Sequence, residues 1–183
     1  VLYCYPEEIY PELIQTMKEE PKICHYLDLP IQHCSDRILK RMGRRTTKQE
    51  LVDIVETLRR EIPDIILRTT LITGFPGETQ EDHEELMEFI DTMEFDRLGV
   101  FTYSPEEDTP AAIMPEQIDE EVKEQRAEYI METQMVIQEE QSEQFVGQTL
   151  EVLVEGFDRY AECYFGRSAM DAPDIDGKVF IEK

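Results

Sequence analysis

Three short segments carry groups that can recognise a polar ligand, and each follows an apolar run. The first is residues 29–36 (LPIQHCSD), in which Gln32, Ser35 and Asp36 offer an amide, a hydroxyl and a carboxylate. Groups of these kinds hold the hydroxyls of a sugar. The alternative is helix capping, in which Ser35 and Asp36 only satisfy the free N–H groups of a helix start.

The second segment is residues 73–79 (TGFPGET). Its two glycines let the backbone approach a ligand closely, and its proline fixes the shape of the loop. No Lys-Ser or Lys-Thr follows, so the segment is not a P-loop, and an acid at the helix start would repel a phosphate. The loop therefore favours a nucleoside without phosphates, and its candidate binding residues are Gly74, Phe75, Pro76, Gly77 and Glu78.

The third segment is Tyr103-Ser104-Pro105, where backbone edges at the end of a strand can meet an adenine. Arg68 lies inside the apolar run of residues 65–72. A charge in a covered strand is costly unless it is paired. Arg68 therefore meets either a buried acid of the protein or the carboxylate of a ligand, and the sequence leaves both options open.

Four apolar runs alternate with amphipathic helical patterns and position these segments. The runs are Val1–Tyr5, Tyr26–Pro30, Ile65–Ile72 and Arg97–Tyr103. Helices are expected between them, two of them opened by Thr47 and Thr79. Alternating strands and helices predict right-handed βαβ units and a parallel sheet, whose ligands bind at the carboxyl ends of the strands. We therefore expect the three segments to meet on one rim.

A different pattern follows the acidic, proline-rich residues 105–115. A long helix is predicted over 119–144, with Ala127, Ile130, Met131 and Met135 on its apolar side. Strands are then predicted at 150–154, 161–166 and 178–181, which indicates a small β-domain. Three strands are too few to close a barrel, so we expect a truncated domain. We also expect the chain to begin mid-domain, and we divide it into 1–118, 119–144 and 145–183.

The formal net charge of −24 favours a basic partner and disfavours nucleic acid, because nucleic-acid binding relies on Lys and Arg. The alternative is that the charge only maintains solubility. The basic cluster at residues 40–45 (KRMGRR) either complements a helix C-terminus or contacts RNA. No run of eighteen apolar residues is present, so we expect no membrane span.

The four cysteines are Cys4, Cys24, Cys34 and Cys163, without any CxxC pair. Their scatter indicates a reducing cytoplasm rather than disulfides. A zinc site from Cys24-His25 and His33-Cys34 is a minor alternative, because the spacing is not a standard one. Residues 171–177 (DAPDIDG) are similar to a calcium loop, but Ala172 would then occupy the first ligand position.

Taken in order, four segments resemble the methylthiotransferase branch of the radical S-adenosylmethionine enzymes, and within it the group that modifies an aspartate of a ribosomal protein. They are LPIQHCSDRILKRMGRR, LRTTLITGFPGET, FDRLGVFTYSPEEDTPAA and GRSAMDAPDIDG. The resemblance covers essentially the whole chain. It implies an α/β fold, namely the C-terminal half of a partial (β/α)6 barrel, followed by a truncated all-β TRAM domain of the OB type.

The resemblance also implies a chemistry. In these enzymes a CxxxCxxC loop holds a 4Fe-4S cluster that cleaves S-adenosylmethionine. The 5′-deoxyadenosyl radical then abstracts hydrogen from the β-carbon of an aspartate on small-subunit ribosomal protein twelve. A second 4Fe-4S cluster takes part in sulfur delivery, and another S-adenosylmethionine supplies the methyl group. This chain contains no CxxxCxxC. We therefore expect no metal ligands in it, and no activity from it alone.

What the resemblance implies for the cofactor is residue-specific. Gln32, Ser35 and Asp36 would lie near the ribose, the Gly74–Glu78 loop beside the methionine or adenine, and Tyr103 and Ser104 near the base, with Arg68 as a carboxylate partner. A basic ribosomal protein would bind the acidic TRAM domain. The alternatives are a tRNA methylthiotransferase and a non-catalytic acidic module for a basic protein. A Rossmann methyltransferase would need a glycine-rich first loop, which the chain lacks.

Overall fold

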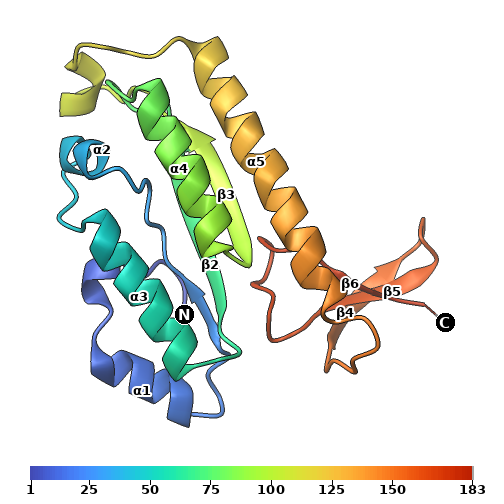
Figure 1. Cartoon of the computed structure of the whole chain (residues 1–183). Coiled ribbons are helices and arrows are strands. Elements are labelled where there is room, and N and C mark those ends of the chain that lie inside the picture. Colours follow the sequence, from blue (N-terminus) through green and yellow to red (C-terminus); the bar gives the residue numbers. More distant parts are fainter. Residues whose placement is uncertain (183) are drawn as a thin grey trace.

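A computed structural model of the chain describes residues 1–182, and it begins with a parallel sheet of three strands in the order β1-β2-β3 (Figure 1). The strands are β1 (Tyr26–Asp28), β2 (Ile66–Thr73) and β3 (Arg97–Thr102). The register aligns Asp28 with Arg68 and Arg68 with Arg97. A parallel α/β sheet is therefore confirmed, with all three carboxyl ends at one edge.

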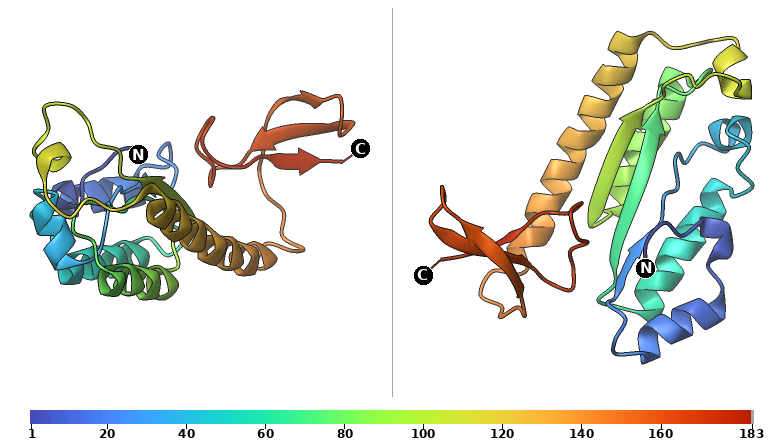
Figure 2. Two further views of the ribbon diagram at one scale, coloured as in Figure 1. Left: turned by 90° about the horizontal axis from the view of Figure 1, so that it is seen from above. Right: turned by 180° about the vertical axis from the view of Figure 1, so that it is seen from behind.

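Helices cover one face of this sheet, as Figure 2 shows from above and from behind. They are α1 (Pro11–Glu19), α2 (Asp36–Arg41), α3 (Lys48–Glu61) and α4 (Gln80–Met93). The predicted starts of α3 and α4 are confirmed, because Thr47 and Thr79 both form capping boxes. On β2, Leu67 and Leu71 are fully buried under the helices, whereas the alternate residues point to the opposite, barer face.

The strand predicted at Val1–Tyr5 is wrong. Tyr3 has a positive φ of 58°, which interrupts an extended backbone, and the short 3₁₀ helix η1 (Pro6–Glu8) follows. The segment nevertheless lies beside β1, because the Asp28 amide donates to the Val1 carbonyl and the Cys4 amide donates to the Asp28 carbonyl. The apolar run thus indicates a place beside the sheet, but its backbone does not form a ladder.

A second short 3₁₀ helix, η2 (Pro110–Ile113), precedes the long helix α5 (Glu120–Glu143), which packs against β3 and α4. The apolar side predicted for α5 is wrong in part, since Met131 and Met135 are exposed. The buried stripe is instead largely polar and consists of Lys123, Arg126, Ile130, Gln134 and Ile137. These polar side chains reach backbone and carboxylate oxygens of the sheet and its loops, which a periodicity of apolar residues does not reveal.

The second sheet is antiparallel, in the order β4-β5-β6, and confirms the small β-domain. Its strands are β4 (Leu153–Asp158), β5 (Cys163–Arg167) and β6 (Val179–Ile181). The loop between β5 and β6 joins it to the amino ends of the parallel strands: Asp171 pairs with Arg97 at 3.1 Å, and Tyr26 donates to Asp176 at 2.6 Å. Within residues 1–182, the helices include none with the length and apolarity that crossing a bilayer requires.

Candidate functional site

A cavity of 470 Å³ lies where the carboxyl ends of β2 and β3 meet the segment that follows β1. Its lining includes four of the predicted residues, Gln32, Phe75, Tyr103 and Ser104. The remaining wall is formed by Met42, Thr70, Ile72, Phe101 and Thr102. The three segments singled out in the sequence therefore do meet on one rim. The site combines aromatic and aliphatic walls with a few polar groups, which is the usual character of a small-molecule site.

The first rim segment is held to β2 by its backbone. The Gln32 amide donates to the Thr70 carbonyl at 3.0 Å, and the Ile72 amide donates to the Gln32 carbonyl at 2.8 Å. Gln32 itself adopts a positive φ of 73°, an uncommon conformation for a residue with a side chain. This turn brings the Gln32 side chain to the cavity. A non-glycine residue at positive φ is itself worth attention as a functional position.

His33 fixes the turn after Gln32, a role that the sequence did not indicate. Its ring is fully buried, and its Nδ1 accepts hydrogen bonds from the amides of Cys34 and Ser35 at 3.0 Å each. Burial lowers the pKa of His33 to about 4, so the ring is neutral near pH 7. Because Nδ1 is the acceptor, the proton resides on Nε2, which lies 3.7 Å from Glu78 Oε2.

Ser35 and Asp36 do not line the cavity. Ser35 precedes α2 without capping it, and its hydroxyl instead donates to Asp82 Oδ1 at 2.7 Å. Burial alone would raise the pKa of Asp82, but hydrogen bonds from Thr79 and Ser35 together with the Arg37 ion pair lower it to about 2. Asp36 is exposed, and its carboxylate accepts from the Lys48 amide at the start of α3. Both side chains thus secure the loops behind the rim.

The side chain of Glu78 is directed inward, beneath the second rim loop (residues 73–79), to which Glu78 itself belongs. It is buried, and it accepts from the Gly74 amide at 2.7 Å, from the Thr73 hydroxyl at 3.2 Å and from Arg126 Nη1 at 2.8 Å. Burial raises the pKa of Glu78, and the neighbouring Arg126 acts against that rise. The carboxylate therefore shapes the loop instead of facing a ligand.

The rest of this loop is clamped from outside by cations. Arg41 Nε donates to the Pro76 carbonyl at 3.0 Å, and Arg37 donates to the Gly77 carbonyl at 2.7 Å. A Cβ on Gly77 would lie 2.7 Å from the Arg41 guanidinium. The cluster at residues 40–45 is thus used within the protein, since Arg44 also stacks on the Tyr5 ring at 5.0 Å.

Tyr103 forms the wall opposite Gln32. Its ring meets Phe75 edge to face, with centroids 5.1 Å apart. Both backbone groups of Tyr103 are already engaged, because its amide donates to Thr73 and its carbonyl accepts from Lys123 Nζ at 2.9 Å. The backbone edge left for a base is therefore that of Ser104. Within residues 1–182, the buried Tyr103 hydroxyl has no hydrogen-bond partner, so a ligand group can serve there.

Arg68 does not reach the cavity, and its partners are acids of the protein. Its guanidinium lies 3.7 Å from Asp28 on the neighbouring strand and 4.0 Å from Asp176 of the β5–β6 loop. Of the two options left open by the sequence, the structure shows the protein carboxylate. Arg68 belongs to the contact between the two sheets, at the end of β2 opposite the rim.

Of the two pairs considered for zinc, Cys24-His25 precedes β1 and His33-Cys34 follows it. His33 Nδ1 is already engaged by backbone amides. Within the described chain, no set of three or more His, Cys, Asp or Glu side chains is placed to hold a metal. Burial also raises the pKa of the Cys34 thiol and of Cys4, which disfavours the thiolate forms that bind iron. The described residues therefore do not fit an iron–sulfur cluster.

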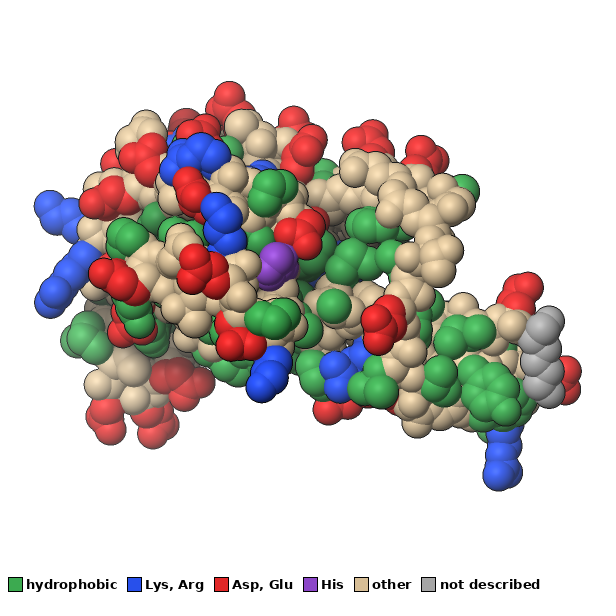
Figure 3. All heavy atoms as spheres, turned by 90° about the horizontal axis from the view of Figure 1, so that it is seen from below, with side chains coloured by type: hydrophobic (Ala, Val, Ile, Leu, Met, Phe, Trp, Pro, Cys, Tyr) green, Lys and Arg blue, Asp and Glu red, His purple; other side chains and the backbone are tan. Residues whose placement is uncertain are grey.

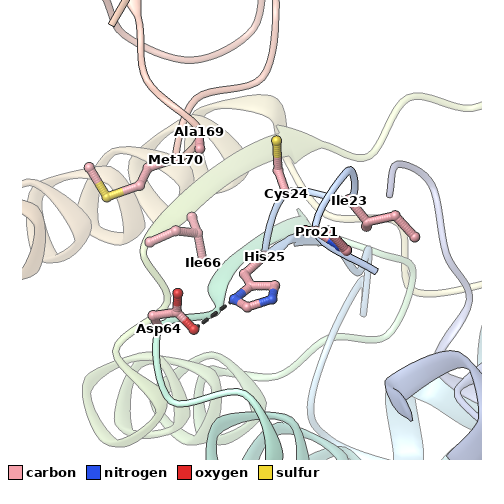
Figure 4. A pocket seen from close by; sticks show the side chains of 8 residues that line it. All are labelled: Pro21, Ile23, Cys24, His25, Asp64, Ile66, Ala169 and Met170. Atoms are coloured by element: carbon pink, nitrogen blue, oxygen red, sulfur yellow. Dashed lines mark hydrogen bonds and ion pairs between the residues drawn. The ribbon is translucent and has the colours of Figure 1, made fainter. Parts of the chain in front are cut away.

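A second cavity, of 320 Å³, lies between the two sheets at the amino ends of the strands (Figure 4). His25 and Asp64 are hydrogen-bonded there at 2.7 Å, and the Cys24 sulfur points away from the His25 ring. These groups do not form a nucleophile–base pair. The rim cavity, with its convergent polar and aromatic groups, is the better candidate site.

Two family models match parts of the chain. Residues 2–90 match the Radical SAM superfamily, and residues 146–183 match the TRAM domain. The ribosomal protein uS12 methylthiotransferase RimO of Lachnoclostridium phytofermentans is 60% identical over 99% of this chain and 41% of its own length. The RimO of Clostridium perfringens is 55% identical over 100% of this chain and 40% of its own length.

The chain thus spans about two fifths of the length of these relatives and resembles them from end to end. Among solved structures, the radical SAM enzyme coproporphyrinogen III oxidase (HemN) from Escherichia coli gives a TM-score of 0.57 at 18% identity. The match covers 74% of this chain and 31% of that one. That likeness shows the fold alone, which is the expected partial radical SAM barrel.

Proposed function

We propose that this chain is part of a radical S-adenosylmethionine methylthiotransferase, whose complete form adds a methylthio group to an aspartate of ribosomal protein uS12. One observation carries the proposal: Gln32, Phe75 and Tyr103 converge on one cavity at the carboxyl rim of a parallel sheet. Residues 2–90, which include the strands β1 and β2 of that sheet, match the radical SAM superfamily. The high identity to two RimO proteins supports the choice of substrate.

The cavity residues fit the nucleoside end of S-adenosylmethionine. Phe75, Phe101 and Tyr103 provide aromatic surface for an adenine. The Ser104 backbone, which has no hydrogen-bond partner within residues 1–182, can contact the edge of the base. The side-chain amide of Gln32 and the Tyr103 hydroxyl, which has no partner among the described residues, can hydrogen-bond to ribose hydroxyls. When bound beside a reduced cluster, S-adenosylmethionine supplies the group that abstracts hydrogen. The residues of this chain would bind and orient it.

The cluster ligands belong outside this chain in the proposed enzyme. The complete enzyme would hold two 4Fe-4S clusters, one for cofactor cleavage and one for sulfur delivery. Two observations support this arrangement: the sequence has no CxxxCxxC, and the described cysteines do not gather with other ligands. The chain would accordingly form one wall of the active site and have no activity by itself.

The proposed partner is the basic protein uS12, attracted by the acidic β-domain. Residues 148–183 contain eight acids and four bases, and a carboxylate-rich surface steers a basic partner. Some of these acids have other roles, since Asp171 and Asp176 contact the parallel sheet and Glu155 pairs with Arg167 at 2.8 Å. The exposed Glu151 and Glu162 are therefore the better docking candidates. Figure 3 shows acidic side chains spread over the lower face of the molecule as well.

The proposed activity also implies a cellular location for the enzyme and a role for each part of the chain. A ribosomal-protein substrate places the enzyme in the cytoplasm. Residues 1–118 would belong to the barrel, 119–144 would close it and 145–183 would form the substrate-reading TRAM domain. A tRNA substrate is less suitable, because the net charge of −24 repels a phosphate backbone.

The test is an exchange enzyme, in which this chain replaces the matching segment of the L. phytofermentans RimO. After cluster reconstitution, it should cleave S-adenosylmethionine and add one methylthio group to uS12, detected by mass spectrometry of the uS12 peptides. The unmodified relative is the positive control. Methylthiolation of tRNA but not of uS12 would reverse the choice of substrate. Absence of S-adenosylmethionine cleavage, with clusters in place, would contradict the assignment itself.

A further inference from the structure

Lys123 is a buried cation on α5 that directly supports the rim. Only 2% of the residue is exposed, and its Nζ donates to the Tyr103 carbonyl at 2.9 Å and to Glu120 at 2.6 Å. The same ammonium lies 5.4 Å from the centroid of the Tyr103 ring. A lysine is seldom so buried, and here its ammonium is shared between the Glu120 carboxylate and one backbone carbonyl of the candidate site.

The stem of Lys123 also passes directly over the second rim loop. A Cβ added to Gly74 would lie 2.2 Å from Lys123 Cγ, so the stem occupies the space that a side chain at Gly74 would need. Gly74 begins the loop that carries Phe75, and Phe75 packs on Tyr103. One side chain therefore contacts both loops that form the aromatic wall of the cavity.

We propose that Lys123 is a positioning residue for the adenosine end of the cofactor. By engaging the Tyr103 carbonyl, it fixes the Tyr103 ring as a cavity wall and leaves the Ser104 backbone to meet the base. The inference rests on the proposed function and adds to it a residue of a helix that does not line the cavity.

Gln134 provides the matched comparison, because it docks the same helix at the other end of the sheet. It is also 2% exposed, and its Nε2 donates to the Phe95 carbonyl at 2.8 Å, just before β3 begins. If Lys123 served only to dock α5, loss of either contact should affect the cofactor equally. If Lys123 positions the rim, only its loss should weaken cofactor binding.

The test compares Lys123→Met, Lys123→Arg and Gln134→Met in the exchange enzyme, by equilibrium dialysis with labelled S-adenosylmethionine. Lys123→Met keeps the stem and removes the donor, and should raise Kd about tenfold while the cleavage rate at saturation stays within about twofold. Lys123→Arg restores a cationic donor and should stay within about threefold of the unsubstituted enzyme. Gln134→Met should leave Kd within about twofold.

A second measurement needs no substitution. In the unsubstituted enzyme, reductive methylation of Lys123, followed by mass spectrometry, should slow at least about threefold when S-adenosylmethionine saturates the rim. Lys18, on α1 and paired with Glu61, should react at an unchanged rate.

Equal Kd values for Lys123→Met and Gln134→Met, or labelling of Lys123 that ignores the cofactor, would overturn the role of Lys123 alone. Failure of the unsubstituted enzyme to bind S-adenosylmethionine would overturn the proposed function, and this inference with it.

Discussion

Glu78 and Arg126 form a buried ion pair at 2.8 Å that joins the second rim loop to the long helix, across 48 residues of sequence. Arg126 also donates to the Glu78 carbonyl at 3.2 Å, so one guanidinium holds both the side chain and the backbone of the loop. With Lys123 on the preceding turn of α5, this pair makes the helix a support for the rim rather than a simple cover for the sheet.

Breaking this pair should be costly. Glu78→Ala removes the partner of a buried guanidinium and frees the Gly74 amide, so the free energy of unfolding should fall by about 3–5 kcal/mol. Urea denaturation of this chain measures the change. The double variant Glu78→Ala/Arg126→Met should lose less than the sum of the single variants, because no unpaired charge remains. Additive losses would show that the two side chains act independently.

The stability of the first rim segment should depend on pH through His33. Burial holds the pKa of His33 at about 4, below the ordinary value of 6.5, so the unfolded chain takes up the proton first as the pH falls. This stability is fully present above about pH 6.5 and is lost as the pH falls through 4. The loss between pH 7 and 4 should amount to roughly 2–3 kcal/mol.

His33→Asn is the matched variant, since its side-chain oxygen can accept from the two amides that His33 Nδ1 serves. Denaturation series from pH 7 to pH 4 should show a shallower decline for the variant than for the unsubstituted chain. Parallel curves would mean that other groups cause the acid sensitivity.

Gly74→Ala should destabilise the second rim loop for two reasons. Gly74 has φ of +73°, which an alanine adopts only with strain, and the added methyl would collide with the Lys123 stem. We expect a loss of about 2–3 kcal/mol in urea denaturation. Gly43→Ala is the control, because Gly43 also has positive φ but no atom lies within 4 Å of the place that an added methyl would take. Equal losses at both glycines would exclude the collision as a cause.

The contact between the two sheets should depend on Arg97 and Asp171. The single variants Arg97→Asp and Asp171→Arg each place like charges together at a 3.1 Å contact, and should speed proteolysis of residues 144–152 between α5 and β4. The charge-swapped double variant should return the cleavage rate most of the way to that of the unsubstituted chain. Fast cleavage of the double variant would indicate that this ion pair does not hold the sheets together.

Local signals in the sequence predict local structure well. The capping boxes at Thr47 and Thr79 and the strand–helix alternation depend on neighbouring residues, and so they are visible in the sequence. The prediction of a strand at Val1–Tyr5 is wrong because the positive φ of Tyr3 is not encoded by an apolar pattern.

Other features of the site depend on contacts between residues that are distant in sequence. The sequence indicates a cap or a ribose ligand at Ser35, but its hydroxyl binds Asp82, 47 residues away. Arg68 pairs with Asp28 and with Asp176 of the β5–β6 loop. None of these pairings follows from composition or spacing, because each joins residues that only the folded chain brings together. The burial of the cations Lys123 and Arg126 on α5 could not be predicted for the same reason. Their spacing of i and i+3 does place them on one face of the helix.

If the rim cavity holds the nucleoside of S-adenosylmethionine, a bulky side chain that fills the cavity should block cofactor binding. Thr70 is half-buried on β2 and lines the cavity, so Thr70→Trp should occupy the space of the ligand while the helix-covered face of the sheet stays intact. Thr92→Trp, on the exposed side of α4, is the control. In the exchange enzyme, Thr70→Trp should weaken S-adenosylmethionine binding at least about thirtyfold, whereas Thr92→Trp should change it less than about twofold. Unchanged binding by a folded Thr70→Trp enzyme would show that S-adenosylmethionine does not bind in the rim cavity.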